Sequence, residues 1–219
     1  MFTELTASDG HSFDCWIEDA TGKRRGGIVI LQEIFGVTDQ LKGVAARYAA
    51  KGFDVAVPAL FDRHEKGAVI PFSDAPRGRD MMLASDLDTT MLDAKAAVEA
   101  LAARGGKVAV IGFCWGGGLA IRAAQVLDIA CAVPFYATRL DSYQIAPLKA
   151  PVMAHFGTED SHVPPEMLQA AREYFPEMEV HTYDGAGHAF ANDARPAAYD
   201  KEAAETAHAR TEAFIAAHM

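Results

Sequence analysis

The sequence contains few cysteines and no long apolar run. Its three cysteines, Cys15, Cys114 and Cys131, show no CxxC spacing, which argues against a structural zinc site and a disulfide framework. A reduced, cytoplasmic protein is therefore expected. No stretch approaches the roughly 20 apolar residues that cross a bilayer, so no membrane association is predicted. Residues 1–5 also lack the basic and apolar regions of a signal peptide.

Positive charge is also scarce. The chain has 20 Lys and Arg residues against 30 Asp and Glu residues, which gives a formal net charge of −10 at pH 7. Because no basic stripe is present, nucleic acid is not an expected partner. Half of the 219 residues are hydrophobic, as in ordinary globular proteins, and this length suits one large α/β domain. We therefore expect a single domain over residues 1–219.

Apolar strand patterns alternate with helical patterns along most of the chain. Strands are predicted at residues 27–33, 53–58, 108–113, 129–136, 151–157 and 180–183. Helices are predicted at residues 38–50, 80–103, 119–124, 163–175 and 196–218. This alternation predicts an α/β fold with a doubly wound, mostly parallel sheet and helices on both faces.

Two segments depart from this alternation. The Asp9-Gly10 turn lies between short alternating runs at residues 2–5 and 12–18, and it predicts an N-terminal antiparallel hairpin. Residues 59–79 have no regular period and follow a predicted strand end, which is where ligands bind in open α/β sheets. A connection of this length is usually functional or mobile.

The segment Gly112-Phe113-Cys114-Trp115-Gly116 connects a predicted strand to an Ala-rich helix. Its spacing is that of the nucleophile elbow, with cysteine where serine usually stands. Glycines two residues away on each side remove Cβ atoms that would collide in so sharp a turn. The positive end of the helix dipole favours the thiolate form of a cysteine placed there. The alternative is a buried core cysteine in an ordinary strand-to-helix turn.

Three further polar residues, Glu33, Asp160 and His188, follow other predicted strands. The carboxyl ends of parallel strands share one edge of a sheet, so these residues can converge with Cys114. The chain order Cys114, Asp160, His188 is the order of nucleophile, acid and histidine in α/β-hydrolases. This joint match favours a catalytic site over a chance arrangement.

The chemistry assigns a role to each residue. His188 is predicted to take the proton of Cys114 and later to protonate the leaving oxygen. Asp160 is predicted to accept the other ring N–H and so to fix the tautomer. The backbone N–H groups of Trp115 and Ile34 are predicted to bind the oxyanion.

Other residues compete for these roles or have simpler explanations. Glu159 and Asp184 are rival acids, although Asp184 precedes a glycine and suits a turn. His155 lies within an apolar strand and is interpreted as a core histidine. Five further histidines are interpreted as surface or turn positions: His11, His64, His181, His208 and His218.

Four segments together resemble the dienelactone hydrolase family of carboxymethylenebutenolidase-like α/β-hydrolases. They are residues 32–36 (QEIFG), 112–117 (GFCWGG), 156–160 (FGTED) and 187–190 (GHAF). The resemblance covers nearly the whole chain and implies an α/β-hydrolase fold. It also implies hydrolysis of small esters or lactones through an acyl-enzyme, with a Cys-His-Asp triad and no cofactor. In this family the glutamate that matches Glu33 contacts the nucleophile and is released when substrate binds.

The resemblance says less about the substrate. Family members that act on dienelactone hold its carboxylate with two arginines, of which Arg77 or Arg79 could be the first. The second falls on Asn192, which cannot form a charged bidentate pair, although Arg195 follows three residues later. The dienelactone substrate is therefore open, whereas the hydrolytic residues are all present. Four further residues are predicted to line the pocket: Phe35, Tyr136, Arg139 and Phe190.

Several alternatives stay open beside this hypothesis. The nearest is an esterase of the same fold that acts on a neutral ester. A thiol redox sensor could use Cys114, but no resolving cysteine is nearby, and Cys131 lies in a predicted core strand. A metal hydrolase built from Glu33, Cys114, Asp160 and His188 would leave the elbow glycines unexplained, so no metal is expected. A non-catalytic relative would not need the complete triad. The sequence leaves the oligomeric state open, a monomer included.

Overall fold

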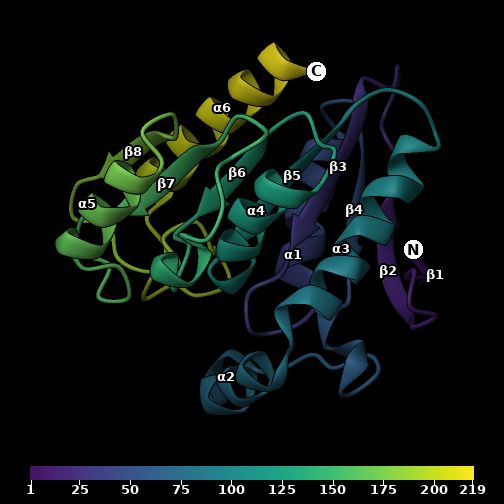
Figure 1. Ribbon diagram of the computed structural model, residues 1–219, viewed down its shortest axis with the longest axis horizontal. Helices are drawn as coiled ribbons and strands as arrows, with labels where there is room; N and C mark the ends of the chain where they lie inside the picture. The colour runs from purple at the N-terminus through teal and green to yellow at the C-terminus, as the bar shows by residue number, and fades with distance from the viewer. The chain divides into compact units, whose positions relative to one another are not determined.

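The computed structural model describes all 219 residues and divides them into two compact units. The N-terminal unit comprises residues 1–109 together with Met219, and the C-terminal unit comprises residues 110–218. In both units, parallel strands pair side by side and carry helices (Figure 1). The predicted α/β class with mostly parallel strands is therefore confirmed. The predicted single domain over residues 1–219 stays a prediction.

Four strands of the N-terminal unit follow the order β1-β2-β4-β3. They are β1 (Phe2–Thr6), β2 (Ser12–Glu18), β3 (Gly26–Leu31) and β4 (Phe53–Pro58). Strands β1 and β2 pair antiparallel around the Asp9-Gly10 turn, which confirms the predicted hairpin. Strand β2 also runs antiparallel to β4, and β4 runs parallel to β3. All residues of β3 and β4 are buried, as their continuous apolar sequences predict.

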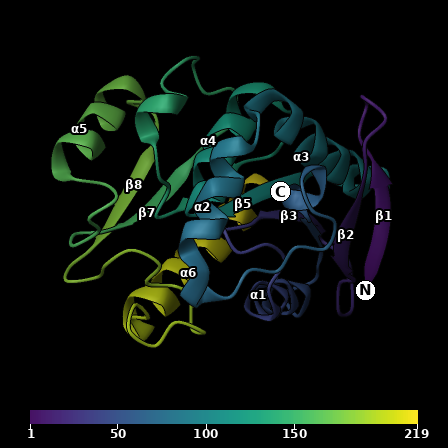
Figure 2. The same ribbon diagram turned by 90° about the horizontal axis from the view of Figure 1, so that it is seen from below.

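Helices α1 (Asp39–Ala49) and α3 (Leu87–Ala102) cover opposite faces of these strands (Figure 2). The hydroxyl oxygen of Thr38 caps α1 by accepting a hydrogen bond from the Leu41 N–H at 3.2 Å. The predicted start of this helix is therefore confirmed. Its predicted apolar face is buried and consists of Leu41, Val44, Ala45 and Tyr48.

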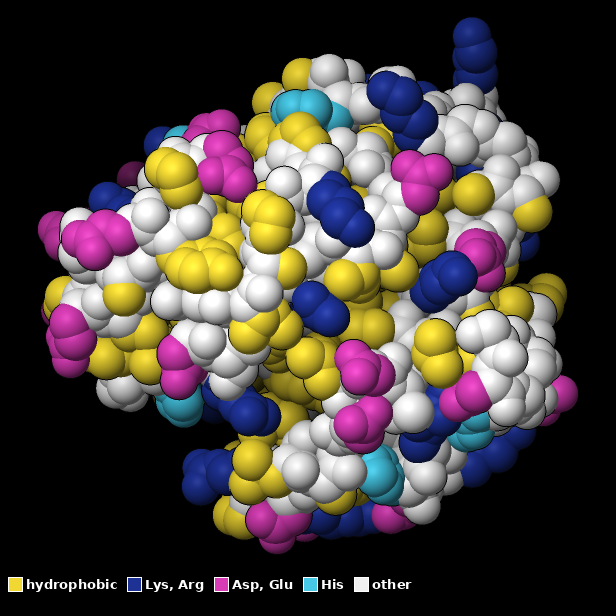
Figure 3. All heavy atoms as spheres, viewed as in Figure 1, with side chains coloured by type: hydrophobic (Ala, Val, Ile, Leu, Met, Phe, Trp, Pro, Cys, Tyr) yellow, Lys and Arg dark blue, Asp and Glu magenta, His cyan; other side chains and the backbone are white.

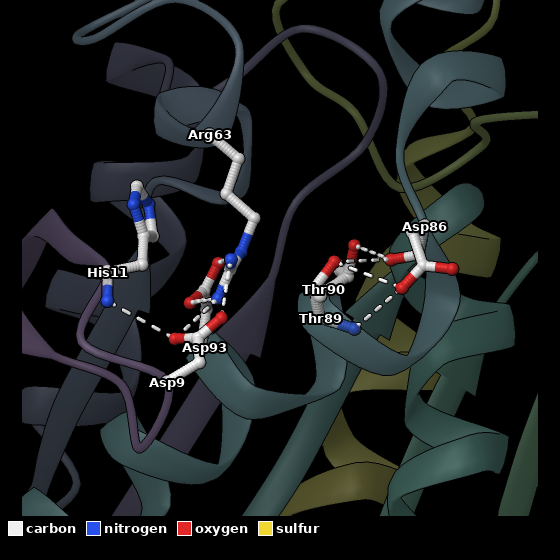
Figure 4. Close-up of polar contacts among 7 residues, drawn as sticks. All are labelled: Asp9, His11, Arg63, Asp86, Thr89, Thr90 and Asp93. Atoms are coloured by element: carbon white, nitrogen blue, oxygen red, sulfur yellow. Dashed lines mark hydrogen bonds and ion pairs between the residues drawn. The ribbon is translucent and has the colours of Figure 1, made fainter.

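The single helix predicted at residues 80–103 is wrong in its extent. The structure has two helices, α2 (Ala75–Ala84) and α3, with an extended backbone at Asp86 between them. The Asp86 carboxylate accepts a hydrogen bond from the Thr89 N–H at 2.9 Å and so starts a new helix (Figure 4). Leu83, which continued the apolar period of the predicted helix, is 61 % exposed.

Helix α2 buries only Gly78. A Cβ atom at this position would collide with the carbonyl group of Ile34, so backbone packs directly on backbone. Figure 1 shows α2 beyond one end of β3 and β4. Two 3₁₀ turns, η1 (Leu60–Arg63) and η2 (Phe72–Asp74), precede it, so the irregular segment predicted at residues 59–79 has short helical structure.

The strands of the C-terminal unit follow the order β5-β6-β7-β8 and pair in parallel. They are β5 (Val108–Phe113), β6 (Ala132–Phe135), β7 (Met153–Gly157) and β8 (Glu179–Tyr183). Helices α4 (Trp115–Val126) and α5 (Pro165–Tyr174) lie on one face of these strands, and α6 (Lys201–His218) lies on the other (Figure 2). The predicted elements are therefore present, although α6 begins later than the predicted residue 196.

A buried histidine joins α6 to two strands of this unit. The Nδ1 atom of His155 lies 2.8 Å from the Tyr183 hydroxyl, and its Nε2 atom lies 3.1 Å from the Thr211 hydroxyl. Because the Thr211 hydroxyl donates to the Ala207 carbonyl at 2.8 Å, it accepts from His155, so Nε2 carries the ring proton. The Tyr183 hydroxyl then donates to Nδ1 and accepts from Arg210 at 3.2 Å. The interpretation of His155 as a core histidine is confirmed.

The prediction that His208 lies at the surface is wrong, because this residue of α6 is 5 % exposed. The centroid of its ring lies 5.1 Å from that of Phe135 and 6.4 Å from that of Phe113. The many alanines of α6 allow the helix to approach the strands closely, and an imidazole ring on its inner face then enters the core.

The surface carries both signs of charge. On the face drawn in Figure 3, acidic and basic side chains are interspersed among hydrophobic and uncharged ones. None of the helices combines the length and the apolar character that crossing a bilayer requires.

One buried ion pair ties the N-terminal unit together. The guanidinium of Arg63 binds the fully buried carboxylate of Asp93 through Nη2–Oδ1 and Nε–Oδ2 distances of 2.7 and 2.8 Å. It also reaches Asp9 in the hairpin turn at 2.8 Å (Figure 4). Burial raises the pKa of Asp93, and Arg63 only partly counteracts this. One cation therefore links the hairpin, the η1 turn and helix α3.

We expect Arg63→Met to lower the free energy of unfolding by about 3 kcal/mol, because it leaves the Asp93 carboxylate buried without its counter-charge. Asp9→Ala is the matched control and should cost far less, because Asp9 meets the same guanidinium at the surface. Urea unfolding of both variants measures the difference. If both variants lost the same free energy of unfolding, the buried charge of Asp93 would not explain the contribution of Arg63 to stability.

His155 should make stability depend on pH. Burial lowers its pKa well below the ordinary value of 6.5, with His181, His208 and Arg210 adding to the effect. Below pH 6.5 the unfolded chain therefore binds a proton that the folded chain does not. Acidification should then lower the free energy of unfolding by up to about 1.4 kcal/mol per pH unit. In His155→Gln the free energy of unfolding should fall less steeply with acidification, because about one proton fewer is taken up on unfolding. Equal slopes in the variant and the wild type would show that His155 does not cause the pH dependence.

Candidate active site

The predicted elbow forms a sharp turn between β5 and α4. Cys114 stands between them with φ 55° and ψ −114°, outside the usual region for residues other than glycine. Its N–H donates to the Phe135 carbonyl at 3.0 Å, and its carbonyl accepts from Gly117 at 3.0 Å and Thr138 at 3.2 Å. The backbone on both sides of the thiol is therefore fixed by hydrogen bonds.

Glycines make this turn sterically possible. A Cβ atom on Gly112 would collide with the carbonyl group of Gly116. A Cβ atom on Gly117 would lie 2.8 Å from the Cα atom of Ala137, closer than real contacts allow. The structure therefore explains the predicted glycine at position 112 and adds position 117 to it.

Left-handed backbone collects at the strand ends of the C-terminal unit. Besides Cys114, the non-glycine residues with positive φ are Tyr136 (37°), Arg139 (57°) and Ala189 (64°). Tyr136 directly follows β6, and Ala189 directly follows His188. Such conformations are costly, and they cluster at functional sites.

Asp160 is the acid that meets His188. The His188 Nδ1 atom lies 2.8 Å from Asp160 Oδ2, and the Asp160 side chain is fully buried. The rival acid Glu159 is exposed. The other rival, Asp184, accepts a hydrogen bond from the Thr158 hydroxyl at 3.3 Å and serves the turn. Of the three candidate acids, the geometry therefore favours Asp160.

The loops that carry Asp160 and His188 are bound to one another through their backbones. The Glu159 N–H donates to the Ala186 carbonyl at 3.0 Å, and the Thr158 N–H donates to the Tyr183 carbonyl at 2.9 Å. A Cβ atom on Gly157 would collide with the same Ala186 carbonyl. The close approach that this glycine permits sets the distance between acid and histidine.

His188 connects Asp160 to Cys114. Cys114 also interacts with the His188 side chain, and since Nδ1 is bonded to Asp160, we expect this contact to use the other ring nitrogen, Nε2. Burial lowers the pKa of His188, but the hydrogen bonds and charges of Asp160 and Cys114 outweigh it and raise the pKa to about 10. The Tyr136 ring packs edge-on against the imidazole at 5.2 Å and limits its rotation.

The other predicted site residues are divided between the two units. Glu33, Ile34 and Phe35 belong to the N-terminal unit, and both Glu33 and Phe35 are buried. Cys114 and Trp115 belong to the C-terminal unit. The predicted contact of Glu33 with Cys114 and the shared oxyanion site of Ile34 and Trp115 therefore stay predictions.

The predicted substrate contacts fall into two groups. Arg77 and Arg79 are exposed on α2, and the Arg77 Nη2 atom contacts both carboxylate oxygens of Glu65, at 2.6 and 2.7 Å. In the C-terminal unit, Tyr136, Phe190 and Asn192 are buried, and the rings of Tyr136 and Phe190 lie 5.4 Å apart. Their contact with substrate stays a prediction.

The sequence analysis missed His162, which lies beside the acid and the histidine. Its ring centroid is 4.2 Å from that of His188, and its Nδ1 atom is 3.5 Å from Asp160 Oδ1. Its backbone N–H donates to the same oxygen at 2.8 Å. The Asp-x-His spacing was the available signal, because a residue two positions after an acid can turn back towards it.

Comparison with known proteins agrees with this geometry. The family model described as the dienelactone hydrolase family matches residues 13–219. The chain belongs to the dienelactone hydrolase family. The carboxymethylenebutenolidase of Pseudomonas sp. (strain P51) is 34% identical over 227 residues, which cover 96% of this chain and 94% of that protein. Carboxymethylenebutenolidase 1 of Cupriavidus pinatubonensis is 30% identical over 225 residues, which cover 97% of this chain and 95% of that protein.

Solved structures show the same fold. A putative dienelactone hydrolase from Klebsiella pneumoniae superposes with a TM-score of 0.81 at 23% identity and covers 97% of both chains. Membership of this family identifies the protein as an enzyme that hydrolyses esters or lactones. The predicted fold and family are both confirmed.

Gly157→Ala tests the link between the two loops. The added methyl group should push Ala186 away and separate Asp160 from His188, because a misplacement of about 1 Å can lower a rate about 100-fold. We expect kcat/KM for ester hydrolysis to fall between about 10- and 100-fold. Gly43→Ala is the control, because its Cβ atom would meet nothing within 4 Å and should leave activity unchanged. Full activity in Gly157→Ala would contradict the proposed loop contact.

Proposed function

We propose that Cys114, His188 and Asp160 form the catalytic triad of this ester or lactone hydrolase. The observation that carries the proposal is the connected chain from the buried Asp160 carboxylate through His188 to the Cys114 thiol. Each residue stands in the role that its chemistry suits: nucleophile, base and orienting acid. The proposed chemistry uses no cofactor.

The first half-reaction forms the acyl-enzyme. His188 Nε2 holds the proton of Cys114, and the sulfur attacks the carbonyl carbon of the substrate. Backbone N–H groups of Trp115 and Ile34 stabilise the negative oxygen of the tetrahedral intermediate. The intermediate collapses when the C–O bond breaks and His188 gives its proton to the leaving oxygen. In a lactone, the leaving oxygen stays attached to the acyl group.

The second half-reaction releases the acid product. Acylation removes the sulfur charge, and with it one of the interactions that raise the pKa of His188. The imidazole can then take a proton from water while the water oxygen attacks the thioester carbon. Collapse of this second intermediate expels the Cys114 sulfur, and the proton on His188 restores the starting pair. Asp160 holds Nδ1 throughout.

Residues of the N-terminal unit would complete the site. Following the family resemblance, we propose that Glu33 contacts Cys114 until substrate binds. Phe35 would supply an apolar wall, together with Tyr136 and Phe190 of the C-terminal unit. Arg77 or Arg79 would meet the acyl part of the substrate.

A second candidate function is hydrolysis of a neutral ester. Arg77 already has an anionic partner in Glu65, and position 192 is a buried, uncharged asparagine. Both observations weaken the case for a carboxylate-bearing substrate such as dienelactone. The hydrolytic mechanism is the same for either substrate. We expect the enzyme to act on small molecules in the cytoplasm.

The test is steady-state hydrolysis of cis- and trans-dienelactone beside neutral aryl esters. Cys114→Ala should lower kcat by about 1,000-fold or more, because the acyl-enzyme can no longer form. Cys15→Ala is the matched control, because Cys15 is a buried thiol of the N-terminal unit without a proposed role. Rapid mixing of the wild type with an aryl ester should show a burst of leaving group.

The outcomes separate the hypotheses. Preference for dienelactone supports a family-type substrate, and preference for aryl esters supports the second candidate. Activity retained in Cys114→Ala would refute the triad. Loss of wild-type activity on treatment with a chelator would instead favour a metal hydrolase.

A further inference from the structure

Three side chains with metal-binding atoms meet at the triad. Asp160, His162 and His188 each offer one oxygen or nitrogen atom, and these atoms all lie within 4.8 Å of one another. The proposed hydrolysis uses Asp160 and His188 but gives His162 no role. Two imidazoles and a carboxylate form a donor set that Zn²⁺ accepts in proteins.

We propose that Asp160, His162 and His188 bind a divalent transition metal such as Zn²⁺, and that binding inhibits the enzyme. Inhibition rests on the proposed function, since it requires Asp160 and His188 to be the acid and base of the triad. Metal binding itself does not depend on that assignment.

The existing spacing is close to what the metal needs. With zinc–ligand distances of about 2.0–2.1 Å, ligand atoms of a tetrahedral site lie about 3.3 Å apart. The Nδ1 atom of His162 is already 3.5 Å from Asp160 Oδ1. The Nδ1 atom of His188 is 2.8 Å from the other carboxylate oxygen, Asp160 Oδ2. A metal held through a single Asp160 oxygen therefore requires a rotation of the carboxylate as well as small shifts of the two imidazoles.

The position of His162 gives the metal a path to the buried acid. The His162 side chain is 55% exposed, whereas those of His188 and Asp160 are 14% and 0% exposed. A metal can therefore bind first to the outer imidazole and then reach the inner pair. The loop contacts and the edge of Tyr136 hold the two inner ligands in place, as supporting residues do in metal sites.

Metal binding would replace a proton. The Nδ1–H proton of His188 leaves to solvent, and a metal–nitrogen bond takes the place of the hydrogen bond to Asp160. The positive metal on Nδ1 then withdraws electron density from the ring, so Nε2 becomes a weaker acceptor for the Cys114 proton. Hydrolysis stops while the metal is bound. Mg²⁺ and Ca²⁺ should not inhibit, because they prefer oxygen ligands.

His162→Ala removes the exposed ligand and tests the site directly. We expect calorimetric titration with ZnCl₂ to show one bound ion per wild-type chain and at least about tenfold weaker binding in the variant. His181→Ala is the matched control, because His181 is also a histidine beside a carboxylate, 2.6 Å from Glu179. It should bind Zn²⁺ at the triad as the wild type does. Equal affinity in His162→Ala and wild type would overturn the proposal.

Two further measurements complete the experiment. Cys114→Ala should keep its Zn²⁺ affinity within about threefold, because the thiol is not one of the ligands; loss of binding there would place the metal on the sulfur and refute the site. In hydrolysis assays, Zn²⁺ should inhibit the wild type reversibly, and His162→Ala should require at least about tenfold more Zn²⁺. Calorimetry measures Zn²⁺ binding without any hydrolysis. An enzyme without esterase activity would therefore refute the proposed function, while the titration would still decide whether the metal site exists.

Discussion

The 2.8 Å hydrogen bond from His188 Nδ1 to Asp160 Oδ2 joins two loops, and the two residues lie 28 positions apart in the chain. The proposed triad depends on it, because with Nδ1 bonded to Asp160 only Nε2 is left for Cys114. The bond itself depends on backbone contacts, above all the approach of Gly157 to Ala186. Positioning of the imidazole is thus a property of two neighbouring strand ends rather than of the histidine alone.

The connections that follow β5, β6 and β8 carry the strained conformations of the C-terminal unit. Cys114 and Ala189 have left-handed backbone, and each is adjacent to or part of the proposed triad. Their unfavourable backbone energy is offset by the buried strands around them, in which β5 and β6 have no exposed residue. Rigid strands thereby allow the connecting turns to adopt geometries that an isolated peptide would avoid.

Much of this arrangement is predictable because its signals are local. The glycine spacing around Cys114 predicts the turn, and the order of Asp160 and His188 after strands predicts their shared edge. Two other features were not predicted. The Asp86 side chain caps a new helix although the apolar period runs on unbroken, and the packing of α6 against the strands buries His208. The place of His162 depends on how a loop turns back, which hydrophobic periodicity does not encode.

Helix α2 offers a consequence for the divergence of this enzyme. Its single fully buried residue is Gly78, which lies on the Ile34 carbonyl, and Arg77 adds an exposed ion pair with Glu65. Substitutions elsewhere along α2 remove little buried surface and therefore cost little folding free energy. Most positions of α2 can therefore change at small cost, whereas Gly78 cannot, because a larger residue would collide with Ile34. During evolution, the side chains of α2 next to the Ile34 loop can therefore change without a prior stabilising substitution elsewhere in the protein.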